Sequence, residues 1–430
     1  MGTYQSDYWQ SDGWGMSRRE TQGGTYHPYL PDLLTICDIG LSAQAANVVS
    51  LAERAIVDLG TTQRHLTNTE PLARLILRSE ALSSSRIEGL ELGAGKLLEF
   101  EALEELGVSH RLDSTEAAVL ANIKAMQHVV EALAQVDSIT LADICEINAM
   151  LLKNTHMAGR GGVLRTEQNW IGGNNVNPIG AAYVPPRPAD VPRLMEDLVA
   201  FCTTSPLPPL AVAAIAHAQL ETIHPFVDGN GRTGRALVHI LLGQAGIATK
   251  VVPPVSLVLA TDKARYINHL AAYRTDDADP ASPSRQVALS DWVEYFANAC
   301  LIACERAEGF ERRMEGIRIG WHDSCPARRG SAAFLLIDAL VDNPVVSVAS
   351  AARLVGRSQE AARLAVNSLV EKGVLVQNAR SRKSGIYAAP KVIDAFAEYE
   401  RSLATPGGDA SAEKPARKVP QRVPEERRRG

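Results

Sequence analysis

A mainly α-helical fold is expected for this chain, with one short β-hairpin and a small mixed helix–strand unit near the C-terminal end. Apolar residues recur at three- and four-residue spacing over long stretches, which is typical of helices that bury one face. Aromatic residues make up only 5% of the 430 residues, so the cores must consist of Ala, Leu, Val and Ile. A Gly- and Pro-rich stretch over 159–192 forbids a continuous helix there.

The composition is that of an ordinary globular protein, with 46% hydrophobic and 22% charged residues. A chain of this length allows two or three domains of roughly 100–200 residues each. The net charge of -5 excludes a whole-chain attraction to nucleic acid or anionic lipid. The six cysteines lie far apart and are expected to be buried thiols. Charges interrupt every apolar stretch before roughly 18 residues, so we expect a cytoplasmic protein without a membrane span.

Residues 1–26 are rich in Gly, Ser, Gln, Tyr and Trp without periodicity, and we expect them to be disordered, as well as the tail 405–430. Between them we expect a helical N-terminal region over 27–112, a helical core over 113–315 and a separate unit over 330–391. The expected helices of the first two regions are 41–59, 71–82, 115–136, 140–152, 191–203, 208–223, 233–242 and 290–314.

Two segments depart from the helical pattern. Residues 168–171 and 182–184 are separated by turn residues and are expected to pair as a β-hairpin. Residues 330–391 follow the order helix, strand, helix, helix, strand, basic turn, strand, which resembles a winged helix-turn-helix domain. Weak DNA binding through the basic turn is one use of such a domain; docking a protein, or a second copy as a homodimer, is the other.

One stretch, HPFVDGNGRTGR starting at His224, joins an apolar helix to the next helix. Gly229, Asn230 and Gly231 permit positive φ angles and an unhindered backbone, so successive N–H groups can point into one concavity. Such a loop at a helix N-terminus attracts phosphate through its free amides and the helix dipole.

The other residues of this stretch complete a nucleotide site. Arg232 and Arg235 lie about one helical turn apart and can bind phosphate oxygens in pairs. Asp228 precedes the loop, where its carboxylate can hold a Mg²⁺ that bridges phosphates. His224 is the base of the stretch that titrates near neutral pH. These residues therefore indicate a nucleotide site with a base beside it.

Two other interpretations of this region are weaker. Gly229–Gly234 formally matches the dinucleotide fingerprint G-x-G-x-x-G, but a helix precedes it instead of a strand. His217, Glu221 and His224 fall on one helix face and could ligate a metal. No second cluster accompanies them, so His217 and Glu221 are interpreted as core or supporting groups.

The string HPFVDGNGRTGR matches the Fic motif H-x-F-x-(D/E)-G-N-G-R-x-x-R at every fixed position, and residues 28–310 resemble the Fic family. The resemblance implies transfer of AMP from ATP to a Ser, Thr or Tyr hydroxyl of a target protein, which can be the chain itself. His224 would deprotonate that hydroxyl, and Asp228 would bind Mg²⁺ on the phosphates. The ATP-binding residues would be Asp228, Gly229, Asn230, Gly231, Arg232, Thr233, Gly234 and Arg235, together with Tyr266, Ala182 and Tyr183.

The expected hairpin resembles the Fic flap, which would hold a target segment by strand addition. Ala182 and Tyr183 belong to this flap. Tyr266 resembles a family position near the adenine, but Arg274 stands where the family carries asparagine.

A second motif, SSRIEG over Ser84–Gly89, matches the inhibitory pattern (S/T)-x-x-x-E-(G/N) that accompanies many Fic proteins. The resemblance implies that Glu88 pairs with Arg235 and occupies the guanidinium that the γ-phosphate needs. ATP would then bind with its α-phosphate misaligned, which costs roughly a hundredfold or more in rate.

Three alternatives stay open at this point. One is a DNA-binding regulator whose Fic core senses a nucleotide. Another is transfer of a different nucleotide monophosphate or of a phosphoryl group. The third is removal of AMP from a modified target, with Glu88 positioning the water.

Overall fold

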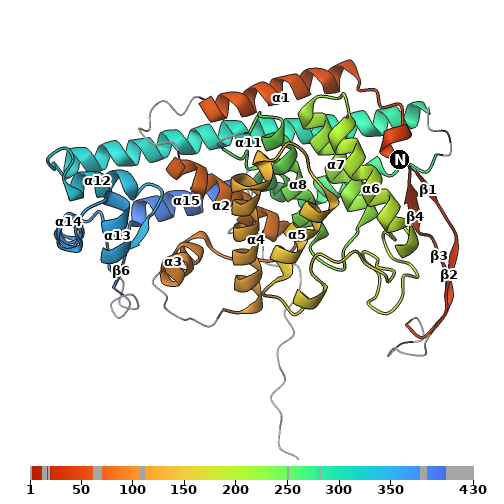
Figure 1. Cartoon of the computed structure of the whole chain (residues 1–430), viewed down its shortest axis with the longest axis horizontal. Coiled ribbons are helices and arrows are strands. Elements are labelled where there is room, and N and C mark those ends of the chain that lie inside the picture. Colours follow the sequence, from red (N-terminus) through yellow and green to blue (C-terminus); the bar gives the residue numbers. More distant parts are fainter. Residues whose placement is uncertain are drawn as a thin grey trace, which may run out of the picture.

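The computed structural model describes residues 2–11, 17, 20–61, 70–105, 112–248, 251–277, 279, 282–377 and 385–402. Within them, 15 α-helices dominate, and the three sheets are antiparallel pairs of short strands. The molecule is elongated, with the N-terminal strands at one end and the C-terminal helices at the other (Figure 1). The expected mainly α fold is confirmed, whereas the predicted tail 405–430 lies outside the described residues.

Two consecutive helices, α7 (Pro209–Ile223) and α8 (Asn230–Gln244), form the centre of the molecule. All residues of α7 from Leu210 onward are buried, as are those of α8 up to Gly243. Burial on every side is typical of the core helices of a large domain. The neighbouring helices of this core are α4 (Ser114–Glu131), α5 (Leu141–Leu152), α6 (Val191–Thr204) and α10 (Lys263–Tyr273).

Long outer helices cover this core. Helix α11 (Pro283–Ser324) has 42 residues and lies side by side with α1 (Ala43–Thr61) along one edge (Figure 1). Helix α2 (Glu70–Ile87) packs against α9 (Val255–Thr261), α4 and α8. Short 3-10 helices occur at Leu34–Ile36, Leu133–Gln135, Ala158–Arg160 and Pro188–Asp190.

Helix α11 is also, within the described ranges, the one helix whose length and composition would suffice to cross a membrane. Of its most apolar window, 56% is buried inside the molecule. Its neighbours are α1, α7, α9 and α10, so it packs as a core helix of this chain.

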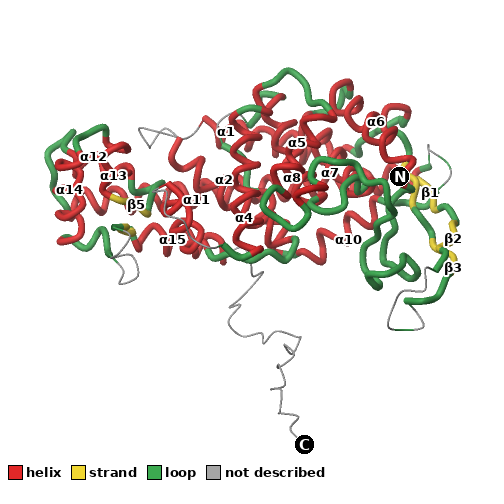
Figure 2. The backbone as a smooth tube through the Cα atoms, turned by 60° about the horizontal axis from the view of Figure 1, so that its bottom comes forward, coloured by secondary structure: helices red, strands yellow, loops and turns green. Residues whose placement is uncertain are grey.

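The N-terminal end forms a two-part β-ribbon, so the expected disorder over 1–26 is wrong for residues 2–11 and 20–26. Strand β1 (Gly2–Tyr4) pairs with β4 (Tyr29–Pro31), and β2 (Asp7–Trp9) pairs with β3 (Gly24–Tyr26). These strands appear in yellow at one end of the molecule (Figure 2). Aromatic contacts stabilise the ribbon, as between Tyr4 and Tyr29, whose ring centroids lie 5.0 Å apart.

The C-terminal subdomain, residues 331–377 and 385–402, follows the expected element order in most respects. Strands β5 (Val345–Ser347) and β6 (Ile386–Ala388) pair, but the expected strand at 374–377 contributes only a single bridge from Val376 to Ala388. The basic turn lies outside the described residues. Its helices are α12 (Ala332–Ala339), α13 (Val348–Val355), α14 (Gln359–Glu371) and α15 (Pro390–Ser402).

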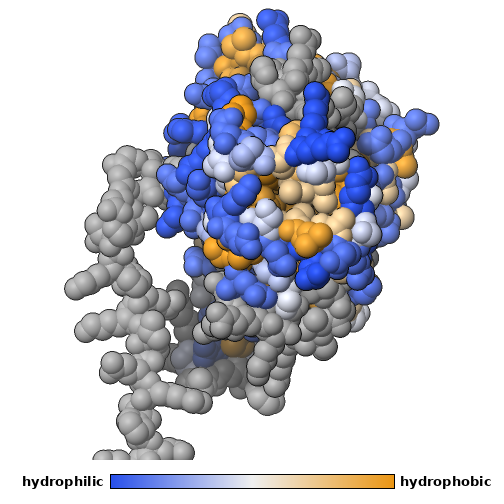
Figure 3. All heavy atoms as spheres, turned by 90° about the vertical axis from the view of Figure 1, so that its left-hand side faces the viewer, coloured by the Kyte–Doolittle hydropathy of each residue, from blue (hydrophilic) through white to orange (hydrophobic). Residues whose placement is uncertain are grey.

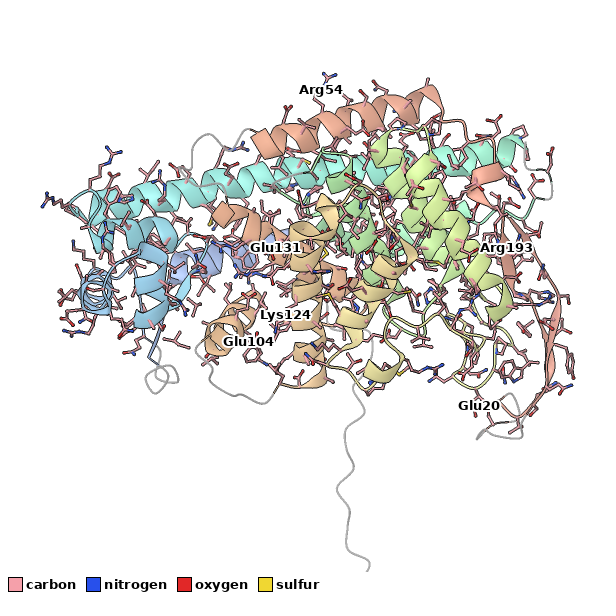
Figure 4. All side chains as sticks on the ribbon, in the orientation of Figure 1. Glu20, Arg54, Glu104, Lys124, Glu131 and Arg193 are labelled. Atoms are coloured by element: carbon pink, nitrogen blue, oxygen red, sulfur yellow. The ribbon has the colours of Figure 1, made fainter. Side chains whose placement is uncertain are left out.

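Several elements differ from the sequence predictions. Helix α11 continues past the expected core boundary at residue 315, and α15 extends the C-terminal unit beyond residue 391. Helix α3 (Ala94–Glu105), which was not expected, lies beside α4, where Lys124 reaches Glu104 (Figure 4).

The expectation of buried thiols holds for half of the cysteines. All six are free, and Cys300, Cys304 and Cys325 are buried. The other three, Cys37, Cys145 and Cys202, are only half-buried, since they lie on helices or loops with one face toward solvent.

Candidate active site

The motif residues form a tight loop between the two buried central helices. His224 caps the end of α7 in the left-handed conformation, with φ 50° and its N–H bonded to the carbonyl of Leu220. Pro225 follows and has no N–H with which to continue the helix. Gly229 adopts φ 78° and starts α8, so the first N–H groups of α8 point back toward His224 without intrahelical acceptors.

Buried side chains fix the backbone of this loop. Both polar atoms of Asn230 bond the main chain of Phe226, at 2.8 Å each, and Phe226 itself is fully buried. Asn148 of α5 donates to the carbonyl of Asp228 at 3.0 Å and accepts from the N–H of Gly162. The loop is therefore held in one conformation before any nucleotide binds.

The imidazole of His224 is set up to be neutral. Burial, together with the charges of Arg165 and Arg274, lowers its pKa to about 4. Its Nδ1 has no hydrogen-bond partner among the described residues, and Glu221 Oε2 lies 3.8 Å away. Burial and the nearby Glu88 raise the pKa of Glu221 to about 7. At neutral pH His224 can therefore accept a proton.

The guanidinium of Arg232 in the loop is buried and incompletely hydrogen-bonded. Arg232 is 3% exposed, and its Nε and Nη1 have no hydrogen-bond partner among the residues described here. Its Nη2 lies 3.9 Å from Asp228, whose side chain is half exposed. Buried guanidinium donors without acceptors fit a site whose acceptor is an anionic ligand.

The carboxylate of Glu88 lies over the loop, against Gly231 and Arg235. Its Oε1 accepts from Arg235 Nη2 at 2.8 Å, so the expected contact is present, and its inhibitory role stays a prediction. Arg235 also donates to the Oγ and main-chain carbonyl of Ser84, at 2.9 and 2.8 Å. A Cβ added at Gly231 would collide with Glu88 Oε1, which places that carboxylate directly against the first turn of α8.

The charges of this pair stabilise each other. Burial alone would raise the pKa of Glu88, but the charge and hydrogen bond of Arg235 hold it below its ordinary value. Gly89 follows with φ +81° and open space around it, so the chain turns away directly after Glu88. Glu88 thus remains ionised at the spot where the loop would hold phosphate.

The flap is smaller than the hairpin predicted from the sequence. Only Ile171 and Tyr183 form a bridge, with N–H to carbonyl distances of 2.8 and 3.1 Å, and Ala182 adds one bond. Pro185 and Pro186 follow and have no N–H to extend the ladder, which explains the short pairing. Ala182 is exposed, whereas Tyr183 is buried and donates to the carbonyl of Thr222.

Two arginines that the sequence analysis did not place in the site contact the flap, and one of them, Arg165, also bonds the loop. Arg165 donates to the carbonyls of His224 and Pro186, at 2.9 and 2.6 Å. The guanidinium of Arg274 lies 3.7 Å from the ring centroid of Tyr183, a cation–π contact. Arg165 had no sequence signal beyond its place in a Gly-rich segment, while Arg274 was noted only as a departure from the family.

The remaining expected site residues lie behind the loop. Tyr266 is 2% exposed and its hydroxyl lies 2.8 Å from His217 Nε2, so its contact with a base stays a prediction. Thr233 donates to the carbonyl of Gly229, and a Cβ at Gly234 would collide with the His217 ring. His217 is fully buried, as a core group, and no metal-binding cluster of His, Cys, Asp or Glu occurs in the described ranges.

Two family models match the regions that build this site. The Fic/DOC family model matches residues 138–242, which contain the loop, flap and central helices. The Fic/DOC family N-terminal model matches residues 46–131, which contain Glu88. Residues 138–242 are therefore a Fic/DOC domain, preceded by a Fic/DOC N-terminal region over 46–131.

Fic relatives resemble part of this chain. The protein adenylyltransferase Fic of Drosophila willistoni is 38% identical over 132 residues, which are 30% of this chain and 24% of the relative. The Drosophila melanogaster protein of the same name is 36% identical over 30% of this chain and 25% of its own length. The chain thus matches about a quarter of the length of these curated relatives.

A solved structure shares the fold over a longer span. The crystal structure of a Fic family protein from Desulfovibrio desulfuricans G20 aligns with a TM-score of 0.50 and 20% sequence identity. The alignment covers 81% of this chain and 97% of that protein. At this identity the likeness concerns the fold.

Proposed function

We propose that this Fic protein transfers AMP from ATP to a hydroxyl group of a target protein, and that Glu88 restrains the transfer. The observation that carries the proposal is the neutral His224, with a side chain 20% exposed, beside a helix N-terminus with two buried arginines. The Drosophila relatives named protein adenylyltransferase Fic support the same chemistry.

The proposed reaction uses the groups on either side of the loop. His224 takes the proton of a Ser, Thr or Tyr hydroxyl, whose oxygen attacks the α-phosphorus of ATP. The bond from that phosphorus to the bridging oxygen breaks, and pyrophosphate leaves with the electron pair. Arg232 and the N–H groups of α8 bind the negative charge of the phosphates, and Arg235 meets the γ-phosphate once Glu88 moves away.

Asp228 fits the magnesium ion that this proposal includes. Its carboxylate is half exposed, and one oxygen accepts only from the N–H of Gly229 at 2.7 Å. One protein carboxylate with phosphate oxygens and water is a common Mg²⁺ environment. Bound there, the ion would neutralise phosphate charge.

The ion pair between Glu88 and Arg235 supports the inhibitory part of the proposal. A carboxylate against Gly231 and Arg235 repels a γ-phosphate and takes up the cation that would bind it. ATP could then bind with its α-phosphate out of line with the hydroxyl, which lowers the rate roughly a hundredfold or more.

The test is labelling with ATP radioactive at the α-phosphate, in the presence of Mg²⁺. Glu88→Gly should raise protein-bound label about a hundredfold over the wild-type chain. Adding His224→Ala to Glu88→Gly should abolish it, while calorimetry should still detect ATP binding. If Glu88→Gly binds ATP but labels no protein in a cell lysate or itself, AMP transfer is the wrong activity.

We propose further that the C-terminal subdomain is a winged helix that contacts protein rather than DNA. On α14, which would be the recognition helix, Arg363 is paired with Glu360 at 2.6 Å, so the helix offers little free positive charge. Polar and charged side chains surround a small apolar area on this end of the molecule (Figure 3). Leu364 is 59% exposed on the same helix. Gel-shift assays with random DNA should show no salt-resistant binding.

A further inference from the structure

Helix α2, which ends in the inhibitory turn, is held from the side opposite Arg235 by the C-terminal subdomain. Arg86 Nη2 lies 3.0 Å from Glu400 Oε2, and Ser79 donates to the other oxygen of the same carboxylate. Glu400 belongs to α15 and is 4% exposed. Over 300 residues separate the partners in sequence, so only the docked subdomain makes this contact.

A second contact lies at the start of the same helix. Arg74 Nη2 lies 3.0 Å from Asp342 Oδ2, and Arg78 donates to the main-chain carbonyl of Asp342 at 3.3 Å. The Asp342 side chain is 2% exposed. A cavity of about 380 Å³ opens beside these side chains, between α2, α3, α4 and the turn before β5. These charged contacts on α2 lie next to open space, while the apolar side of α15 packs on α11, where Tyr399 stacks on Phe310 with ring centroids 4.5 Å apart.

The position of Arg86 connects these contacts to the inhibitory residues. Arg86 stands midway between Ser84 and Glu88 in the last turn of α2, and both of these contact Arg235. Glu88 directly follows the end of α2 at Ile87 and its N–H bonds the carbonyl of Ser85, so a displacement of the turn that holds Arg86 also displaces the carboxylate of Glu88. The buried Glu400 thus fixes the same turn that covers the site.

The rest of α2 is anchored on the catalytic side. Glu80 is fully buried and accepts hydrogen bonds from the N–H and hydroxyl of Ser256, and it lies 2.9 Å from His239 Nε2. Asn122 also donates to the carbonyl of Ala81 at 2.7 Å. In the final turn Asn122 also donates to Ser85 Oγ at 3.0 Å and Lys263 donates to the carbonyl of Ile87, so loss of the Glu400 contact would loosen this turn without removing the helix.

We propose that the C-terminal subdomain sets the strength of inhibition: docked on α2 through Glu400 and Asp342, it holds Glu88 on Arg235, and its displacement frees Glu88. The inference rests on the proposed function, because it explains how the contact between α15 and α2 controls the inhibition by Glu88. A signal that relieves inhibition would act by lifting α15 from α2.

The test compares Glu400→Gln with Glu398→Gln in the full chain. Glu400→Gln removes the charge that Arg86 pairs with and keeps the shape of the side chain. Glu398 lies on the same helix but is 59% exposed and pairs with Arg313 of α11, so Glu398→Gln is the matched control. Labelling from ATP should rise about tenfold in Glu400→Gln, the loss expected for a hydrogen bond to a buried charge, and should stay at wild-type level in the control.

The same substitutions in the Glu88→Gly background separate the two proposals. There Glu400→Gln should add nothing, because its effect passes through Glu88. An equal rise in both backgrounds, or none in either while Glu88→Gly is strongly active, overturns the inference. If Glu88→Gly itself labels nothing, the proposed function fails instead.

Amide hydrogen exchange tests the contact independently of activity. The backbone of residues 84–89 should exchange faster in Glu400→Gln than in Glu398→Gln, while residues 79–81 keep their protection. Arg86→Gln removes the same contact from the α2 side, where the side chain is 29% exposed, and covers the case that Glu400→Gln folds poorly. Unchanged exchange at 84–89 in both folded variants contradicts the proposal.

Discussion

The loop after His224 and the flap face each other across the site, but they are held in different ways. The loop is fixed by buried side chains within a few residues or on the adjacent helix, such as Asn230 and Asn148. The flap has three backbone hydrogen bonds between its two sides and local side-chain bonds, such as that from Trp170 Nε1 to the carbonyl of Asn174, and distant segments add further support. The main-chain N–H of Tyr29 donates to the carbonyl of Val184, and the rings of Trp9 and Trp170 are 5.7 Å apart.

This difference matches what each part has to do. A loop that aligns phosphates loses rate when it moves, so a rigid conformation is favoured. A flap that receives different target segments by backbone pairing gains from a conformation that can adjust. The N-terminal ribbon supplies the flap with contacts that can be made and broken without disturbing the loop.

Arg165→Met should have the largest effect, because Arg165 bonds both parts. It removes a donor from the carbonyl of Pro186 and one from that of His224, which keeps Asn169 at 3.3 Å, and this should cost about 2–4 kcal/mol in the free energy of unfolding. Labelling in the Glu88→Gly background should fall at least about tenfold. Arg160→Met is the control, because Arg160 is 44% exposed and pairs only with Glu167. Equal urea midpoints for the two variants would show that Arg165 does not join loop and flap.

The pH dependence of the labelling rate of the Glu88→Gly variant should show the second largest effect. The base must be neutral, and the pKa of His224 is lowered to about 4, so the neutral form persists as pH falls and is lost only through pH 4. Initial rates should stay nearly level from pH 8 to about 5, whereas a solvent-exposed histidine would lose them below about 6.5.

Glu221 supplies the control for this profile, since the pKa of its carboxyl is raised to about 7. Glu221→Gln should leave the acid midpoint near 4. A midpoint near 7 that vanishes in Glu221→Gln would assign the titration to that carboxyl instead of to the imidazole.

Asn148→Ala should have a moderate effect confined to the loop. It removes donors to Asp228 and Thr233 and the acceptor for the N–H of Gly162, at a cost of about 1–3 kcal/mol. Calorimetry on the Glu88→Gly background should show weaker ATP binding, and hydrogen exchange over the flap should not change. Faster exchange in the flap would mean that the two parts are coupled.

Trp9→Ala should have the smallest effect and should be confined to the flap. An edge contact between aromatic rings contributes about 0.5–1.5 kcal/mol, so residues 168–184 should exchange faster by a few-fold. ATP affinity should stay unchanged. Tyr8→Ala is the matched control, since Tyr8 is 62% exposed on the same strand.

The sequence was most informative where the structure is most local. The loop could be placed because its glycines, arginines and histidine act within twelve consecutive residues, and the central helices could be placed from their apolar periodicity. The ribbon could not, because strands of three residues carry no alternation, and their partners, such as Trp170 for Trp9, lie far away in the chain. The contact of Glu400 with Arg86 was also hidden, since an acidic residue on a surface-like helix is ordinarily solvated.

Helix α11 is longer than the sequence pattern predicts, and its length has a mechanical consequence. Its second half carries many charges because it lies beyond the central core, and the sequence pattern therefore ended too early, at residue 314. With 42 residues it is about 63 Å long, and one unbroken rod runs from the catalytic lobe to the last helices. A short loop joins α11 to α12, but α11 also packs directly on α12 and α15, so a ligand that pulls on the C-terminal subdomain also tilts a stiff helix that reaches the catalytic core.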